Sequence, residues 1–215
     1  CAGDMLVGKK KVSMEPAIAF MKTVASRYPV YYGNGNHECR LRQEPGIYGD
    51  KYARYEKELT EAGVHILSND HAIVPAGNTF VNVYGYELEM AYYQKFNQLE
   101  LTKGQLEQAL GEADRRRFTI LIAHNPVYGE TYADWGADLT VSGHLHGGII
   151  RLPFIGGVIT PQAKLFPKYD GGHYRIGDRH LVVSRGLGEH TVKIRIGNPP
   201  ELVFLHLCPS GSTGT

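Results

Sequence analysis

The sequence predicts a layered domain of the α/β or α+β class, in which β-sheets pack against helices. Helical and strand-like hydrophobic patterns alternate along the 215 residues, which is typical of such layered architectures. A hydrophobic content of 42% with 21% charged residues is ordinary for a soluble globular protein. No stretch approaches the roughly 20 apolar residues of a transmembrane helix. The formal net charge of +1 gives no indication of a nucleic-acid-binding surface or a polybasic membrane patch.

The first half of the chain predicts two helices and four strands. Apolar residues recur at helical spacing over 17–25, directly after Pro16, which favours a helix start. The other predicted elements are a strand over 29–32, an amphipathic helix over about 48–62 ended by Gly63, a strand over 64–67, and a hairpin of 71–74 with 79–86 around the turn 75–78.

The second half predicts one helix followed mainly by strands. Thr102 and Gln105 match a capping box, with a helix continuing to about Asp114. The clearest strand is the apolar run 118–123, which ends at His124. The other predicted strands are 139–142, 173–176, 180–185, 191–196 and 201–207. We expect one domain over 1–208 and a disordered tail over 209–215, rich in Ser, Gly and Thr.

The cysteines and the start of the chain carry little information on compartment. The chain has three cysteines, an odd number without metal-knuckle or redox spacing, so they form no disulfide framework. No signal peptide is present. Because the chain opens on Cys1 rather than Met, we expect that its true amino terminus, with any anchor or leader, is missing.

Several short polar motifs are scattered along the chain, most of them beside glycines. Four of them follow short apolar runs, and the carboxyl ends of neighbouring strands converge in the crevice where open α/β sheets bind ligands. Oxygen and imidazole donors without a thiolate suit Mn, Fe, Zn, Ni or Mg. The sequence therefore predicts a metal site with five ligands: Asp4, Asn36, His124, His144 and His146.

Each predicted ligand also has a plainer interpretation. Asp4 could cap a turn beside Gly3, and His124 could be a core histidine at a strand end. Asn34 and Asn36 could both be turn residues, and we favour Asn36 because it directly precedes His37. We expect ordinary surface or core roles for five other histidines: His65, His71, His180, His190 and His206. His173, beside Gly171 and Gly172, could approach the cleft, but we do not favour it as a site residue.

Together these motifs resemble those of the calcineurin-like metallophosphoesterase superfamily. Its pattern runs Asp-x-His, Gly-Asp, Gly-Asn-His-(Asp/Glu), His and Gly-His-x-His, and all but the first block occur here in order over residues 3–146. Residues 181–188 and 200–202 are similar to a bacterial branch of small, often membrane-tethered phosphoesterases. The resemblance implies a four-layer αββα sandwich with two central mixed sheets flanked by helices. The absent Asp-x-His block leads us to expect that the N-terminal strand is missing.

The resemblance also implies roles for the site residues and two divalent metal ions as cofactors. Asp4 would bridge the two ions, and His146 would bind the first of them. The second ion would take Asn36, His124 and His144. His37 would be catalytic, stabilising the phosphoryl transition state or protonating the leaving oxygen. Glu38 would orient His37 or its loop.

The implied reaction is hydrolysis of a phosphomonoester or phosphodiester by a hydroxide that bridges the two ions. A regulatory metal-binding domain without full activity and a protein Ser/Thr phosphatase are the alternatives. We expect a small-molecule or lipid-linked phosphate ester as substrate, no nucleic acid partner, and weak metal occupancy with little turnover from these 215 residues alone. A membrane tether in the missing amino terminus would make the protein membrane-associated, and otherwise we expect it in the cytoplasm.

The tyrosine-rich segment before residue 100 has two interpretations. In one interpretation, Tyr92, Tyr93 and Phe96 are packing residues of a helix. In the other, their segment forms a wall beside the substrate. For Arg151 and Arg185 a structural or surface role is favoured over contact with phosphate.

Overall fold

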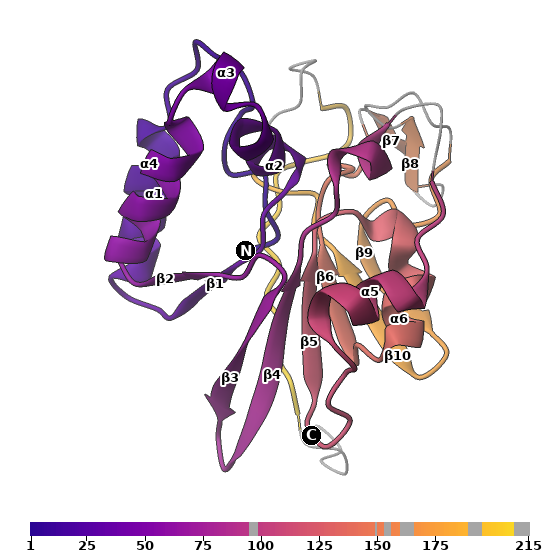
Figure 1. Ribbon diagram of the computed structural model, residues 1–215. Helices are drawn as coiled ribbons and strands as arrows, with labels where there is room; N and C mark the ends of the chain where they lie inside the picture. The colour runs from indigo at the N-terminus through magenta and orange to yellow at the C-terminus, as the bar shows by residue number, and fades with distance from the viewer. Residues whose placement is uncertain (95–98, 149, 153–155, 160–165, 189–194, 209–215) are drawn as a thin grey trace.

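The protein is an α+β sandwich of four layers (Figure 1). A computed structural model describes residues 1–94, 99–148, 150–152, 156–159, 166–188 and 195–208. One outer layer consists of helices packed on a small sheet, and the other consists of helices packed on a large sheet. The two sheets face each other across an apolar layer. The fold class predicted from the sequence is therefore confirmed.

The first half of the chain builds the small sheet and its helices. Pro16 lies in the first turn of α1, where its missing N–H would have no helical partner in any case. The elements are α1 (Glu15–Ala25), β1 (Val30–Tyr32), α2 (Asn36–Gln43), α3 (Pro45–Tyr48), α4 (Lys51–Glu61) and β2 (Val64–Ile66). Strands β1 and β2 are parallel, with Val30 opposite Val64. Cys1 runs beside β1, since its carbonyl accepts from Gly33 N at 2.9 Å.

The rest of the chain builds the large sheet and the layer outside it. Its elements are β3 (Asp70–Ala76), β4 (Thr79–Tyr86), η1 (Met90–Tyr93), α5 (Lys103–Leu110), β5 (Thr119–Ala123), η2 (Pro126–Tyr128), α6 (Gly129–Trp135), β6 (Leu139–Ser142), β9 (Gly172–Ile176) and β10 (Arg179–Val183). A separate antiparallel pair is formed by β7 (Ile150–Leu152) and β8 (Gly156–Ile159).

The large sheet is mixed, with strand order β3-β4-β5-β6-β10-β9. Its four central strands are parallel, and the outer strands β3 and β9 are antiparallel to their neighbours. In this register Tyr86 pairs with Ala123 and Ile122 pairs with Val141. The residues that follow β4, β5 and β6 therefore emerge at one edge of the sheet.

Apolar clusters lie between the four layers and hold them together. Tyr32, Tyr55 and Leu59 are fully buried between the small sheet and α4, with α1 and α2 completing that cluster. Leu121 and Trp135 lie in the cluster between the large sheet and helices α5 and α6. A third cluster around Leu67, Val83 and Ile122 fills the space between the two sheets.

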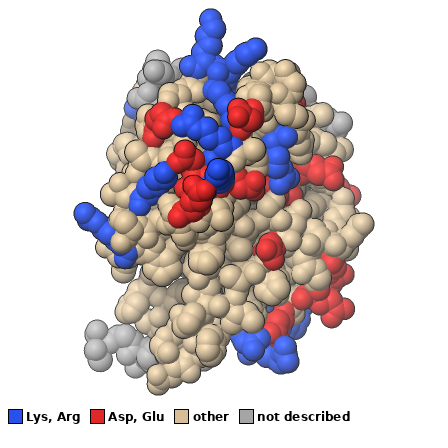
Figure 2. Space-filling view, turned by 60° about the vertical axis from the view of Figure 1, so that its left-hand side comes forward, with Lys and Arg blue, Asp and Glu red and all other residues tan. Residues whose placement is uncertain are grey.

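The helical face of the small layer carries both signs of charge. Figure 2 shows basic and acidic side chains intermixed on the face that includes α1 and α4. Ion pairs join α1 to α4, with Lys22 Nζ 2.5 Å from Glu58, and Arg54 paired with both Glu15 and Glu58. Such exposed pairs each contribute at most about 1 kcal/mol. This face is therefore neither uniformly positive nor uniformly negative.

Most predicted elements are confirmed, although two helices differ from the prediction at one end and one predicted strand is wrong. The helix predicted over about 48–62 is confirmed as α4, but it begins at Lys51, because Gly49 has φ 67° and separates α3 from α4. The helix expected to reach Asp114 ends at Leu110, because Gly111 (φ 75°) provides a left-handed stop. Residues 201–207 form no strand, and Leu202 and Phe204 are 84% and 90% exposed. An alternating pattern becomes a strand only where a neighbour completes the hydrogen bonds.

Other features were not predicted or lie outside the described residues. Helix α2 was missed because Asn, His, Cys and Arg give its polar sequence no apolar stripe. Helix α6 and strands β7 and β8 were also not predicted. Two predictions lie outside the described residues: most of the strand predicted over 191–196, namely residues 191–194, and the whole predicted tail 209–215. Within the part of the chain that is described, no helix has the length and apolar character needed to cross a membrane.

Truncating Leu121 should test the core between the large sheet and its helices. Leu121 is fully buried in β5, so Leu121→Ala should lower the free energy of unfolding by about 2–5 kcal/mol, measured by urea denaturation. Leu187→Ala is the matched control, because the Leu187 side chain is 52% exposed, and it should change the free energy of unfolding by less than about 1 kcal/mol. Equal effects of the two substitutions would contradict this assignment of the core.

Candidate metal centre

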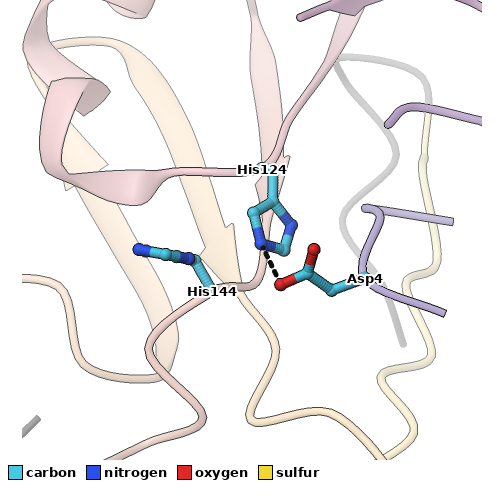
Figure 3. Close-up of side chains that lie close together, drawn as sticks. All are labelled: Asp4, His124 and His144. Atoms are coloured by element: carbon cyan, nitrogen blue, oxygen red, sulfur yellow. Dashed lines mark hydrogen bonds and ion pairs between the residues drawn. The ribbon is translucent and has the colours of Figure 1, made fainter. Parts of the chain in front are cut away.

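Three of the predicted ligands converge at the edge where the sheets meet. Each of Asp4, His124 and His144 offers one ligand atom, and these atoms lie within 4.8 Å of one another. Figure 3 shows the Asp4 carboxylate directed at the His124 ring, with His144 on the other side of that ring. The two imidazole centroids are 5.1 Å apart. Residues 120 positions apart in sequence thus form one cluster of potential metal donors.

The position of Asp4 depends on close contact between two glycine-containing segments. A Cβ on Gly3 (φ +83°) would lie 2.3 Å from Gly35 N, and a Cβ on Gly35 would lie 2.3 Å from Asp4 Oδ1. This closeness places the carboxylate at the start of α2, where Asp4 Oδ1 accepts from His37 N at 2.9 Å. Asp4 Oδ2 lies 2.9 Å from His124 Nε2. The carboxylate therefore joins α2 to the end of β5.

A buried carboxylate fixes the same loop from behind. Glu38 has no exposed surface, and its Oε2 accepts from Asp4 N at 2.9 Å and from Gly35 N at 3.0 Å. Its Oε1 accepts from Leu6 N and from the Tyr32 hydroxyl, both at 2.9 Å. Burial and the nearby Asp4 charge raise the pKa of Glu38. Glu38 was predicted to orient His37 or its loop; the structure shows it bonded to the Asp4 segment and to the loop before His37.

His124 directly follows β5 and is held by both ring nitrogens. Nδ1 donates to the carbonyl of Ala2 at 2.5 Å, which leaves Nε2 facing Asp4. A backbone carbonyl on one nitrogen fixes the tautomer and orientation of an imidazole whose other nitrogen can bind a metal. The sequence placed His124 at a strand end but could not give this orientation.

The segment after β6 turns sharply to present its histidines. Gly143 N donates to His124 O at 3.0 Å, which places His144 beside His124. Asn198 Nδ2 donates to the carbonyls of His146 and Gly148, at 2.6 and 2.7 Å. Asn198 is buried and holds the turn from a distant part of the chain. Sequence reasoning did not identify Asn198, because nothing in its local pattern indicates this contact.

Backbone strain is concentrated on the predicted ligands. Among the described residues, five non-glycine residues have positive φ, and three of them are Asp4 (55°), His144 (67°) and His146 (52°). A non-glycine residue in this region costs about 1–2 kcal/mol. Strained residues persist where the surrounding structure holds them, and they cluster at functional sites.

The other three predicted site residues lie around this cluster in different ways. Asn36, the first residue of α2, is buried, and its Oδ1 has no hydrogen-bond partner among the described residues. Such an orphaned carbonyl oxygen fits a hard metal ion. His37 accepts at Nδ1 from Gly8 N at 3.0 Å. His146 is outside the three-residue group, though its charge acts on His144.

The ionisation of Asp4 and His144 suits a cation. Burial alone would raise the pKa of the Asp4 carboxyl, but the adjacent His124 holds that pKa well below its usual range. Burial disfavours the charged form of His124 and would lower its pKa. The effect of the Asp4 carboxylate is larger and opposite, so the pKa of His124 is raised. Burial lowers the pKa of His144 well below its usual value and also lowers that of His37. His144 is therefore a neutral imidazole with a lone pair available at neutral pH.

A second buried carboxylate joins the two halves of the chain near the cluster. Glu87 follows β4, and its side chain accepts from Asn34 Nδ2 at 2.9 Å, from the Cys39 thiol at 3.1 Å and from the Ser68 hydroxyl at 2.6 Å. Arg42 forms an ion pair with it. All four donors precede β3, in or just after the part of the chain that builds the small sheet, whereas Glu87 follows β4 of the large sheet. Sequence reasoning missed Glu87, since a lone Glu after a strand carries no signal.

The remaining histidines and arginines have partners away from the cluster. His65 stacks on Tyr31, His71 stacks on Tyr84, and His173 lies 2.8 Å from His180 between their ring nitrogens. His206 is exposed, and His190 lies outside the described residues. The two arginines considered as phosphate contacts instead form ion pairs: Arg151 with Asp170, and Arg185 with Glu201.

A four-layer sandwich that brings a carboxylate and two imidazoles together at the ends of its loops and strands has the features of a metal-binding domain. The model of the family described as "Calcineurin-like phosphoesterase" matches residues 1–148. The chain belongs to the calcineurin-like phosphoesterase family, whose members are metal-dependent. The family assignment inferred from the motifs is therefore confirmed.

Two curated relatives extend the likeness beyond the matched region. Uncharacterized metallophosphoesterase YkuE of Bacillus subtilis is 31% identical over 176 residues, which are 82% of this chain and 54% of that protein. Phosphodiesterase YaeI of Escherichia coli is 25% identical over 206 residues, which are 95% of this chain and 68% of that protein. The chain thus spans little more than half the length of YkuE.

Replacing Asp4 should test the metal centre. Asp4→Asn removes the charge shared by the start of α2 and His124, so the affinity for Mn²⁺ measured by calorimetry should fall at least about tenfold. Asp178→Asn is the matched control, because the Asp178 side chain is 98% exposed, and it should leave the affinity unchanged. Unaltered Mn²⁺ binding by Asp4→Asn would remove Asp4 from the ligand set.

Replacing Glu38 should test the support behind the ligands. In Glu38→Gln the amide nitrogen faces donors where the carboxylate accepted, so about 3–5 kcal/mol of unfolding free energy should be lost, together with Mn²⁺ affinity. Thermal and urea unfolding with and without Mn²⁺ measure both effects. Glu44→Gln, at an exposed position just after α2, is the control and should alter neither.

Proposed function

We propose that this protein hydrolyses phosphate esters at a centre that holds two divalent ions. The observation that carries the proposal is the meeting of Asp4, His124 and His144 within 4.8 Å, beside the start of α2 and His37. Membership of the phosphoesterase family supports the reaction type. The rare backbone conformations of Asp4 and His144 support a functional role for this cluster over a purely structural one.

The residues of the cluster would hold the ions as follows. Asp4 has two carboxylate oxygens facing different partners, which suits a ligand shared between two ions. Asn36, His124 and His144 would complete the coordination of one ion, and His146 would bind the other. Divalent ions held there would neutralise phosphoryl charge and supply a nucleophilic water at neutral pH.

In this proposal His37 would act on the departing oxygen of the ester. Its Nδ1 accepts from Gly8 N, so the neutral ring carries its proton on Nε2. Burial lowers the pKa of His37 and keeps the ring neutral. The N–H at Nε2 would donate a hydrogen bond to the phosphoryl group and stabilise charge on the leaving oxygen. The Asp4 carboxylate fixes the start of α2 through His37 N, which orients this ring.

The substrate we propose is a small-molecule or lipid-linked phosphate ester. The relative YaeI is named as a phosphodiesterase, which makes an aryl phosphodiester the first compound to test. A metal-binding role with little turnover is the second candidate, and it is favoured by the position of His146 outside the three-residue group. A count of tightly bound ions decides between one occupied site and two.

Hydrolysis of bis(4-nitrophenyl) phosphate with Mn²⁺ should test the reaction. His37→Ala should lower kcat about 10²–10⁴-fold, because a positioned proton donor to the leaving oxygen is lost. His206→Ala changes an exposed histidine and should keep the wild-type rate. Hydrolysis that is undiminished in His37→Ala, or no hydrolysis with any common divalent metal, would refute the catalytic assignment.

A further inference from the structure

One aromatic ring outside the predicted ligand set packs directly on the metal centre. Tyr93 ends the short helix η1, in the connection between β4 and α5. Its ring centroid is 5.1 Å from that of His144, at an interplanar angle of 66°, and 6.2 Å from that of His124, at 49°. The three rings form a continuous wall on one side of the cluster.

The neighbouring tyrosine anchors this segment away from the cluster. The Tyr92 hydroxyl accepts from Gln105 Nε2 at 2.5 Å, and the Tyr92 ring lies edge-on to Tyr128 at 5.8 Å. The Tyr128 hydroxyl donates to the Tyr92 carbonyl at 3.4 Å. Consecutive tyrosines therefore have different environments: Tyr92 fixes η1 on α5 and η2, and Tyr93 borders the ligands.

The hydroxyl of Tyr93 is available to a ligand. Within the described part of the chain, the contacts of Tyr93 are made by its ring, and the side chain is only partly buried. A tyrosine hydroxyl in such surroundings ordinarily has a hydrogen-bond partner. A tyrosine hydroxyl is protonated at neutral pH and can donate a hydrogen bond. An anionic group beside His144 is the complementary acceptor.

We propose that Tyr93 contacts the bound phosphate ester, with its hydroxyl donating a hydrogen bond to a phosphoryl oxygen while its ring supports the His144 imidazole. This inference rests on the proposed function, because it takes the phosphoryl group to bind at Asp4, His124 and His144. The hydroxyl and the ring have separate tasks. The hydroxyl recognises the phosphate, and the ring maintains the geometry of a ligand.

Two substitutions at Tyr93 separate these tasks. Tyr93→Phe keeps the ring and removes the donor, so the Kd of inorganic phosphate for the Mn²⁺-loaded protein should rise about tenfold or more by calorimetry. The kcat/KM for bis(4-nitrophenyl) phosphate should fall by a similar factor, with Mn²⁺ affinity within twofold of wild type. Tyr93→Ala also removes the ring, so Mn²⁺ affinity should fall as well.

Tyr92→Phe is the matched control on the same short helix. It removes only the hydrogen bond with Gln105, so phosphate affinity and kcat/KM should stay within twofold of wild type. The proposal is overturned if Tyr93→Phe also leaves the phosphate Kd within twofold. Should the wild-type protein bind phosphate without hydrolysing the diester, the proposed function fails, and the phosphate Kd still decides the role of Tyr93. Wild-type protein that neither binds phosphate nor hydrolyses the diester overturns both.

Discussion

The whole site depends on one buried carboxylate that is not itself a ligand. Glu38 accepts four hydrogen bonds, and two of the donors are the backbone N–H groups of Asp4 and Gly35. A buried charge is tolerable only when it is fully hydrogen-bonded, so this carboxylate fixes the loops around it. The closeness of Gly3 to Gly35, the direction of the Asp4 side chain and the start of α2 are all consequences of that constraint.

The predicted ligands come from the two sheet layers, and buried polar contacts fix the position of one layer relative to the other. Asp4 and Asn36 belong to the small-sheet half, whereas His124 and His144 follow strands of the large sheet. Glu87, which follows β4 of the large sheet, joins the two layers through four donors that all precede β3. These contacts maintain the distances that metal coordination requires, and apolar packing, being non-directional, could not set them alone.

The residue types of the site could be predicted from the sequence, and its supports could not. Short motifs placed Asp4 and His124 beside glycines and strand ends, because those positions follow from local patterns. Asn198 and Glu87 act over long sequence separations and have no local signature. Segment 118–123 was found because buried parallel strands are nearly continuous apolar runs. The predicted strand 201–207 failed because strand formation depends on a neighbour as well as on the pattern.

The predicted metal ligands and the aromatic ring that packs beside them come from different segments of the chain. Tyr93 lies in the connection between β4 and α5, which contains none of the predicted ligands, and Tyr92 anchors that connection on α5. Connections of this kind tolerate insertion and replacement better than the strands they join. Relatives could therefore differ in their substrates through changes in this single connection, while the predicted metal ligands and their supporting hydrogen bonds stay the same.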